Sequence, residues 1–119
     1  MNHASKILFL ILACTWILWQ ERNETGTAMG KTVRPPAVWT MQQAFDTSDA
    51  CEQAKMVFGK AHAQALKQDA PDAEVEALAI APWVVNFRRQ NDKVALVITY
   101  MFQCWPDTVD PSKGKPGKS

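Results

Sequence analysis

The sequence predicts an α+β fold in which one helix, at about residues 48–68, packs on a small antiparallel sheet of three to four strands. Three observations predict this fold. A helical apolar stripe follows Asp49, a β-hairpin pattern spans residues 83–104, and one cysteine lies in each of these segments. The chain has 119 residues, which is enough for one domain of this kind and no more.

The chain divides into four predicted segments. Residues 1–19 form a signal peptide or membrane-anchor segment. Residues 20–36 are polar, rich in Gly, Thr and Arg, and end in two prolines, which is typical of a linker or loop. The α+β domain occupies residues 37–106, and a disordered basic tail occupies residues 107–119.

The helix is predicted from its start signals and from its periodicity. Residues 46–49 offer several N-cap side chains in a row, and Asp49 with Glu52 has the spacing of a capping box. Small apolar residues then recur at steps of three and four, which places them on one stripe that can lie close to a sheet. The predicted stripe consists of Cys51, Ala54, Phe58, Ala61 and Ala65, widened by Val57 and Leu66.

Residues 83–104 have the pattern of a β-hairpin with its turn at residues 90–93. Along the second strand, the even positions from Val94 to Cys104 form one strongly apolar face. We expect the helix to cover this face, because Cys51 points from the helix into the same space. The disulfide would then tie the start of the helix to the end of the last strand.

Two shorter segments complete the predicted domain. Residues 37–45 read as a short strand. The acidic connection at residues 68–82 is predicted to be solvated, with either a short helical turn or an extra strand inside it. Its carboxylates lack the regular spacing and the glycine turn of a calcium loop, so no metal site is predicted there.

The apolar run from Ile7 to Trp19 predicts export or membrane attachment, because a secretory leader needs about 7 to 15 apolar residues and a spanning helix about 20. Three interpretations remain open. A signal peptidase removes the segment, or it stays as a short anchor through which the protein contacts the membrane, or Cys14 is lipidated after a lipobox-like sequence. Each interpretation places the protein in the periplasm or the cell envelope.

Cys51 and Cys104 are the only cysteines outside the apolar run. In an oxidising compartment, such an isolated pair is most simply a disulfide. Closing a loop of about 50 residues would stabilise the fold by about 4 kcal/mol in the chain-entropy model. Two separate buried thiols are the alternative interpretation. A metal-binding role is not expected, because the sequence has no CxxC and no nearby histidine.

The charge pattern gives no sign of a nucleic-acid surface. The formal net charge is +1, and the two signs are mixed along most of the chain. The tail carries lysines spaced by Gly and Pro, and we interpret it as solvated, with contact to anionic lipid as the alternative. These lysines are Lys113, Lys115 and Lys118.

No catalytic, cofactor or metal constellation is predicted. His62 is the only histidine outside the leader region, and no nucleophile or second ligand stands at a recognisable spacing from it. We interpret it as a structural, partly exposed imidazole in the middle of the helix. The segment from Gly26 to Thr32 is similar to a phosphate-binding loop, but it has three residues between its glycines where that motif needs four.

Near its end the chain reads Cys104-Trp-Pro-Asp-Thr-Val-Asp-Pro, followed by a Gly/Pro/Lys tail. In this it resembles a group of short exported bacterial proteins that end in a C-x-P-D-T-V-D-P segment and have no assigned activity. Phe45 to Thr47 ahead of the helix cysteine, and the Trp-x-x-Trp at Trp16, resemble weaker patterns of the same group. The resemblance implies a signal peptide and a small disulfide-linked domain. It also implies a first strand at residues 16–21, which would shorten the leader to about residues 1–13.

Two classes of function remain open. The one we favour is a non-enzymatic envelope domain that binds a ligand or partner through exposed tryptophans, although ordinary packing is the alternative for each of them. The other is a small hydrolase or inhibitor-like module that acts on envelope polymers through Asp107 and Asp110, residue types that also cap turns beside prolines. The tryptophans in question are Trp39, Trp83 and Trp105.

Overall fold

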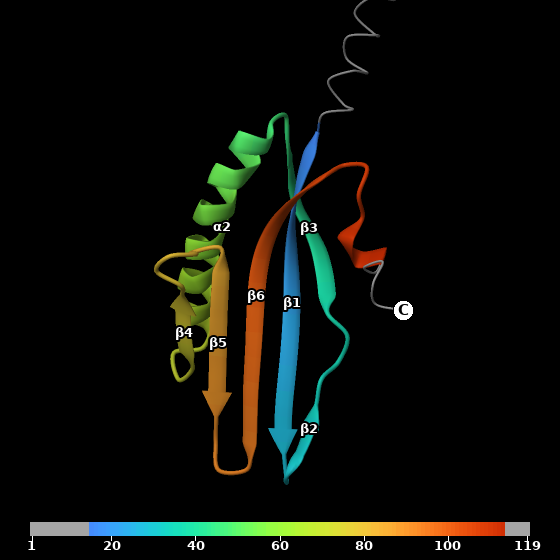
Figure 1. Cartoon of the computed structure of the whole chain (residues 1–119). Helices are drawn as coiled ribbons and strands as arrows, with labels where there is room; N and C mark the ends of the chain where they lie inside the picture. Colours follow the sequence, from blue (N-terminus) through green and yellow to red (C-terminus); the bar gives the residue numbers. More distant parts are fainter. Residues whose placement is uncertain (1–14, 114–119) are drawn as a thin grey trace, which may run out of the picture.

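The computed structural model describes residues 15–113, and within this range one α-helix lies on one face of a six-stranded antiparallel sheet (Figure 1). The helix, α2, spans Ser48–Asp69. The strand order is β2-β1-β6-β5-β4, and β3 also pairs with β1. The strands are β1 (Trp16–Ala28), β2 (Lys31–Val33), β3 (Val38–Phe45), β4 (Glu74–Ala77), β5 (Val84–Gln90) and β6 (Val94–Pro106), and a short 3-10 helix, η1 (Pro111–Lys113), follows them.

The predicted architecture is confirmed in its main features, which are one helix on an antiparallel sheet and a disulfide that joins them. The predicted number of three to four strands is wrong, because the described residues form six. The segments expected at residues 37–45 and 83–104 are β3 and the β5–β6 hairpin. The additional strands are β1, β2 and β4, of which β4 is the extra strand considered for the acidic connection.

The prediction of a linker or loop at residues 20–36 is wrong, because these residues continue β1 and then form β2. The first strand expected at residues 16–21 is the start of β1. Residues of β1 beyond position 20 are mostly polar, and the strand is held by pairing with β6 along its whole length. The chain then reverses at Met29 and Gly30, whose φ angles of 54° and 79° are typical of a two-residue hairpin turn.

Two clusters of buried side chains lie between α2 and the sheet. One surrounds the disulfide and contains Leu18 of β1 and Phe102 of β6. The other lies further along the helix, where β5 and β6 supply the larger side chains and α2 supplies small ones. Its buried members are Ala63, Ala70, Val85, Phe87, Ile98 and Tyr100.

The predicted disulfide between Cys51 and Cys104 is confirmed, with the two Cα atoms 6.1 Å apart. Cys51 lies in the first turn of α2 and is fully buried, and Cys104 lies near the end of β6. The bond therefore ties the start of the helix to the central part of the sheet. As predicted, α2 covers the face of β6 that carries Cys104.

The helix begins as predicted but buries a partly different stripe. Thr47 is the N-cap, and its hydroxyl accepts a hydrogen bond from the backbone N–H of Ala50 at 3.1 Å. An α-helix has about 3.6 residues per turn. A stripe built on steps of three and four residues therefore rotates gradually away from the side of the helix that faces the sheet. The predicted members Val57, Ala61 and Ala65 are exposed, and the core side is formed by Cys51, Ala54, Phe58, Gly59, His62, Ala63 and Leu66.

Several predictions concern residues at the two ends of the chain. The leader up to about residue 13, Cys14 and residues 114–119 of the predicted disordered tail lie outside the described residues. Residues 107–113 of that tail form a turn and η1, in which Pro111 is buried. No helix within residues 15–113 is long and apolar enough to cross a membrane.

Gly59 allows α2 to lie directly against the segment that leads into β5. A Cβ atom at this position would lie 2.0 Å from the carbonyl oxygen of Pro82 and 2.8 Å from the Cα atom of Trp83. Both of these are backbone atoms, which cannot move aside without shifting the strand. A glycine in the middle of the helix is therefore a packing requirement.

We predict that Gly59→Ala lowers the free energy of unfolding by about 1–3 kcal/mol, the usual range for overpacking. The direction of the change in stability tests the close approach, because the same substitution in an unobstructed helix raises the free energy of unfolding by about 1 kcal/mol. Urea unfolding followed by far-UV circular dichroism measures the difference. Gln64→Ala, on the exposed side of the same helix, should change stability by less than about 0.5 kcal/mol. A more stable Gly59→Ala protein would contradict the close approach.

Candidate binding face

The face of the sheet opposite α2, called the open face below, is identified by strand register. Tyr100 and Phe102 of β6 face the helix, where their rings lie against His62. Alternate residues of a strand point to opposite sides, so the intervening residues of β6 lie on the open face. Their pairing partners share that face: Ile17, Trp19, Glu21 and Asn23 in β1, Trp39 in β3, Val84, Asn86 and Arg88 in β5, and Glu74 and Glu76 in β4.

Five residues of the open face form a connected cluster, the tryptophan patch: Trp19, Glu21, Trp39, Gln103 and Trp105. The ring of Trp39 packs edge-to-face with that of Trp19, with centroids 6.3 Å apart and an interplanar angle of 81°. Nε1 of Trp105 donates to Oε1 of Gln103 at 3.0 Å. Nε2 of the same glutamine donates to Oε1 of Glu21 at 2.8 Å. The patch thus combines aromatic rings from three strands with a chain of polar groups across β1 and β6.

Two polar side chains of the patch are almost completely buried. Glu21 is 9 % exposed and Trp19 is 8 % exposed. The indole N–H of Trp19 is buried and has no hydrogen-bond partner among the described residues. A buried donor without an acceptor costs about 1–3 kcal/mol, so an acceptor brought to this position would be stabilised.

The structure separates the three tryptophans that the sequence singled out. Trp39 and Trp105 lie on the open face, both half-buried, within the patch. Trp83 lies on the helix side, where it packs against the cluster around the disulfide. Nζ of Lys55 lies 4.3 Å from the centroid of the Trp83 ring, an arrangement typical of a cation–π contact. The patch therefore contains two of the three residues.

Sequence reasoning missed Trp19, Glu21 and Gln103 as members of the patch. Glu21 and Gln103 are 82 positions apart in the chain, and only the pairing of β1 with β6 brings them together. A local signal was present in the spacing of two residues that separates Trp19 from Glu21 and Gln103 from Trp105. That spacing places each pair on one face of a strand, but it does not identify the partner strand.

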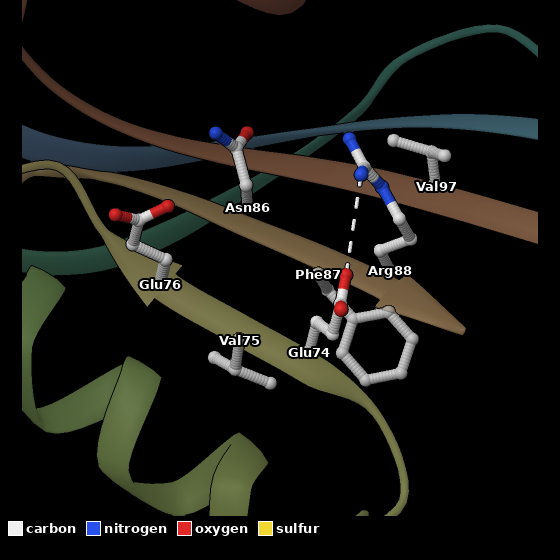
Figure 2. A pocket seen from close by; sticks show the side chains of 7 residues that line it. All are labelled: Glu74, Val75, Glu76, Asn86, Phe87, Arg88 and Val97. Atoms are coloured by element: carbon white, nitrogen blue, oxygen red, sulfur yellow. Dashed lines mark ion pairs between the residues drawn. The ribbon is translucent and has the colours of Figure 1, made fainter.

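A shallow pocket of about 330 Å³ lies at the other end of the open face, between β4, β5 and β6. Figure 2 shows Asn86 and Arg88 standing on one side of the strands, with Val75 on the side of the helix. Nη1 of Arg88 lies 3.9 Å from Oε1 of Glu74, and both side chains are largely exposed. Such an exposed pair contributes little to stability, so its charges remain accessible to a ligand.

The carboxylates proposed for a hydrolase lie in the turn after β6, and the structure gives Asp110 a local partner. The Asp110 carboxylate accepts hydrogen bonds from the backbone N–H and the hydroxyl of Ser112. These bonds hold the pKa of Asp110 below its ordinary value, which is the opposite of what a general acid needs. Asp107 is exposed, and its backbone N–H donates to the carbonyl oxygen of Thr15 at 3.0 Å.

Comparisons with known proteins add no assignment to this site. No family model matches the chain, and neither the curated proteins nor the solved structures gave a match. Among the described residues, no three histidine, cysteine, aspartate or glutamate side chains are grouped so that they could hold a metal ion. The interpretation of the open face therefore depends on its own geometry.

His62 lies on the other side of the sheet, in the core. Its ring packs edge-to-face with Tyr100, with centroids 4.3 Å apart, and lies 5.8 Å from the ring of Phe102. Nε2 of His62 is buried without a hydrogen-bond partner among residues 15–113. Burial lowers the pKa of His62, because a charged imidazole would lose its hydration here.

We predict that stability falls as the pH is lowered from about 7.5 to about 5. The unfolded His62 binds a proton near pH 6.5, whereas the folded imidazole binds it only at lower pH, so protons favour the unfolded state in this window. Urea unfolding at a series of pH values measures this slope. His62→Phe keeps an aromatic ring in the core and should make the slope shallower. A variant with the same slope as the wild type would show that His62 does not cause it.

Proposed function

We propose that this protein is an exported, non-enzymatic binding module and that its open face is the binding surface. The observation that carries the proposal is the tryptophan patch, in which two half-buried tryptophans share a face with a buried, hydrogen-bonded carboxylate. Aromatic side chains with a polar end are the residues most often found at the energetic centre of binding surfaces. Both tryptophans lie on the face opposite the helix, where each is half-buried.

Export is supported by the apolar run from Ile7 to Trp19 and by the disulfide. Disulfides persist in oxidising compartments such as the periplasm and are rare in the cytosol. The role of Cys51 and Cys104 as a structural pair also agrees with a small domain that gains stability from a covalent link. We therefore propose the periplasm or the cell envelope as the location of the binding module.

The alternative of a small hydrolase or inhibitor-like module has less support. It requires an accessible carboxylate with a pKa suited to proton transfer, and the hydrogen bonds from Ser112 lower the pKa of Asp110. Asp110 instead begins the 3-10 turn η1, because its carbonyl oxygen accepts from the backbone N–H of Lys113 at 3.1 Å. These contacts support a structural role for the turn.

We predict that components of the native cell envelope bind the tryptophan patch and leave the helix side unchanged. The five tryptophans give separate indole N–H signals in the NMR spectrum of the ¹⁵N-labelled protein, so the site can be located directly. Titration with a solubilised envelope extract should shift or broaden the signals of Trp19, Trp39 and Trp105. The signal of Trp83, on the helix side, should stay in place.

Two variants control this experiment. The double substitution Trp39→Ala and Trp105→Ala should remove the response at Trp19, whereas Trp83→Phe should preserve the response at the patch. An extract that moves no indole signal, or that moves only the signal of Trp83, would contradict the proposal. The signal of Trp83 also reports whether the double variant remains folded.

A further inference from the structure

We propose that the end of the sheet furthest from the start of β1 is a membrane-contact site that binds anionic phospholipid. This end, called the sheet tip below, consists of the turns at residues 29–30 and 91–93 and the strand ends beside them (Figure 1). The two turns lie side by side, because Ala28 pairs with Lys31 on one side and with Val94 on the other. The inference concerns a surface other than the open face and does not depend on the role of that face.

Exposed apolar side chains gather at the sheet tip. Met29 is 90 % exposed, Val33 is 63 % exposed and Val94 is 44 % exposed. Val33 pairs with Gly26, and Val94 pairs with Ala28. Gly26 and Ala28 are two positions apart in β1, so both valines lie on the same side of the sheet. The sheet tip therefore presents an apolar surface, of which Met29 is the most exposed member.

The turn itself does not explain why residue 29 is a methionine. Met29 has a φ angle of 54°, a left-handed conformation in which Asn, Asp or Gly is favoured at this position of a two-residue hairpin turn. The neighbouring turn uses a favoured residue: Oδ1 of Asn91 accepts from the backbone N–H groups of Lys93 at 3.1 Å and Val94 at 2.9 Å. An unfavoured conformation in an almost fully exposed apolar residue points to a role in function.

Cations flank this apolar surface. Lys31 follows the first turn, Lys93 lies in the second turn, and Arg34 follows β2. They give the sheet tip three positive charges against one carboxylate, that of Asp92, whereas the formal net charge of the whole chain is only +1. Among residues 15–113, none of the three cations forms an ion pair. Such cations attract the phosphate groups of anionic lipids.

An anionic bilayer fits this combination better than a folded acidic partner does. The side chain of Met29 is unbranched and flexible, so it can enter the boundary between lipid headgroups and acyl chains without a preformed pocket. The side chains of Lys31 and Lys93 would then stay at the level of the lipid phosphates. One methionine and a few cations form a small anchor, so the contact is weak and reversible.

The test follows the methionine methyl groups of the whole protein by NMR after ¹³C labelling. The probes are vesicles of phosphatidylglycerol with phosphatidylcholine and vesicles of phosphatidylcholine alone, each with a gadolinium-chelating lipid that broadens nearby signals. The anionic vesicles should broaden the signal of Met29 more than those of Met41 in β3 and Met56 in α2, which are 63 % and 41 % exposed. The neutral vesicles should not distinguish Met29 from the other two.

The variants repeat the titration with the anionic vesicles, and binding of the sheet tip is measured from the amide signal of Gly30. Met29→Asn should weaken binding about tenfold, the loss expected when one buried apolar side chain is removed. The midpoint of urea unfolding should stay unchanged or rise in this variant, because asparagine tolerates a positive φ angle. Lys31→Gln and Lys93→Gln should each weaken binding about fivefold. Met56→Gln, on the exposed side of α2, should bind as the wild type does.

Several results would overturn the proposal. Neutral vesicles that act as strongly as anionic ones, or a Met29→Asn protein that binds as the wild type does, would each do so. Met41 pairs with Trp19, roughly 30 Å from Met29 along β1, so a stronger effect on Met41 would show that the opposite end of the sheet approaches the membrane. Soluble hexaglutamate tests an acidic protein partner. A shift of the Met29 signal by hexaglutamate, without broadening by the anionic vesicles, would assign the sheet tip to such a partner instead.

Discussion

The disulfide between Cys51 and Cys104 is the constraint on which the two-sided character of this domain depends. It joins the first turn of α2 to the end of the central strand β6, with Leu18 and Phe102 packed around it. The helix can then lie on only one face of the sheet. Gly59 brings the middle of the helix against the backbone before β5, and the opposite face carries the half-buried Trp39 and Trp105.

The parts of the fold that could be predicted are those that depend on residues close together in the sequence. Thr47 caps the helix through a hydrogen bond three residues away, and the alternation in β6 gives one apolar face within a single strand. Such signals need no knowledge of a partner. The disulfide could also be predicted from the number of cysteines, because an isolated pair of cysteines leaves few alternatives for its pairing.

The parts that could not be predicted depend on contacts between distant residues. The polar half of β1 lacks the apolar alternation of a half-buried strand, and it is a strand because β6 pairs with it throughout. The predicted apolar stripe of the helix is also wrong at Ala61, which is exposed. Several small residues fit a helical period equally well, and only packing on the sheet determines which of them are buried. For the same reason, no local pattern could join Glu21 to Gln103.

In the proposed function, the helix side of the sheet provides stability and the open face provides recognition. On the helix side, Trp83 and His62 fill space in the core, and their polar groups are secondary to packing. On the open face, the side chains of Glu21, Gln103 and the half-buried Trp105 are connected by hydrogen bonds. This division explains why two tryptophans of similar appearance in the sequence, Trp83 and Trp105, are assigned different roles.

The most direct test of this account is the free energy of unfolding of the oxidised protein compared with the double variant Cys51→Ala and Cys104→Ala. The bond closes a loop of 53 residues, so the chain-entropy model predicts a loss of about 4 kcal/mol in urea unfolding, enough to unfold much of a small domain. A double variant as stable as the oxidised protein would contradict the central role of the disulfide.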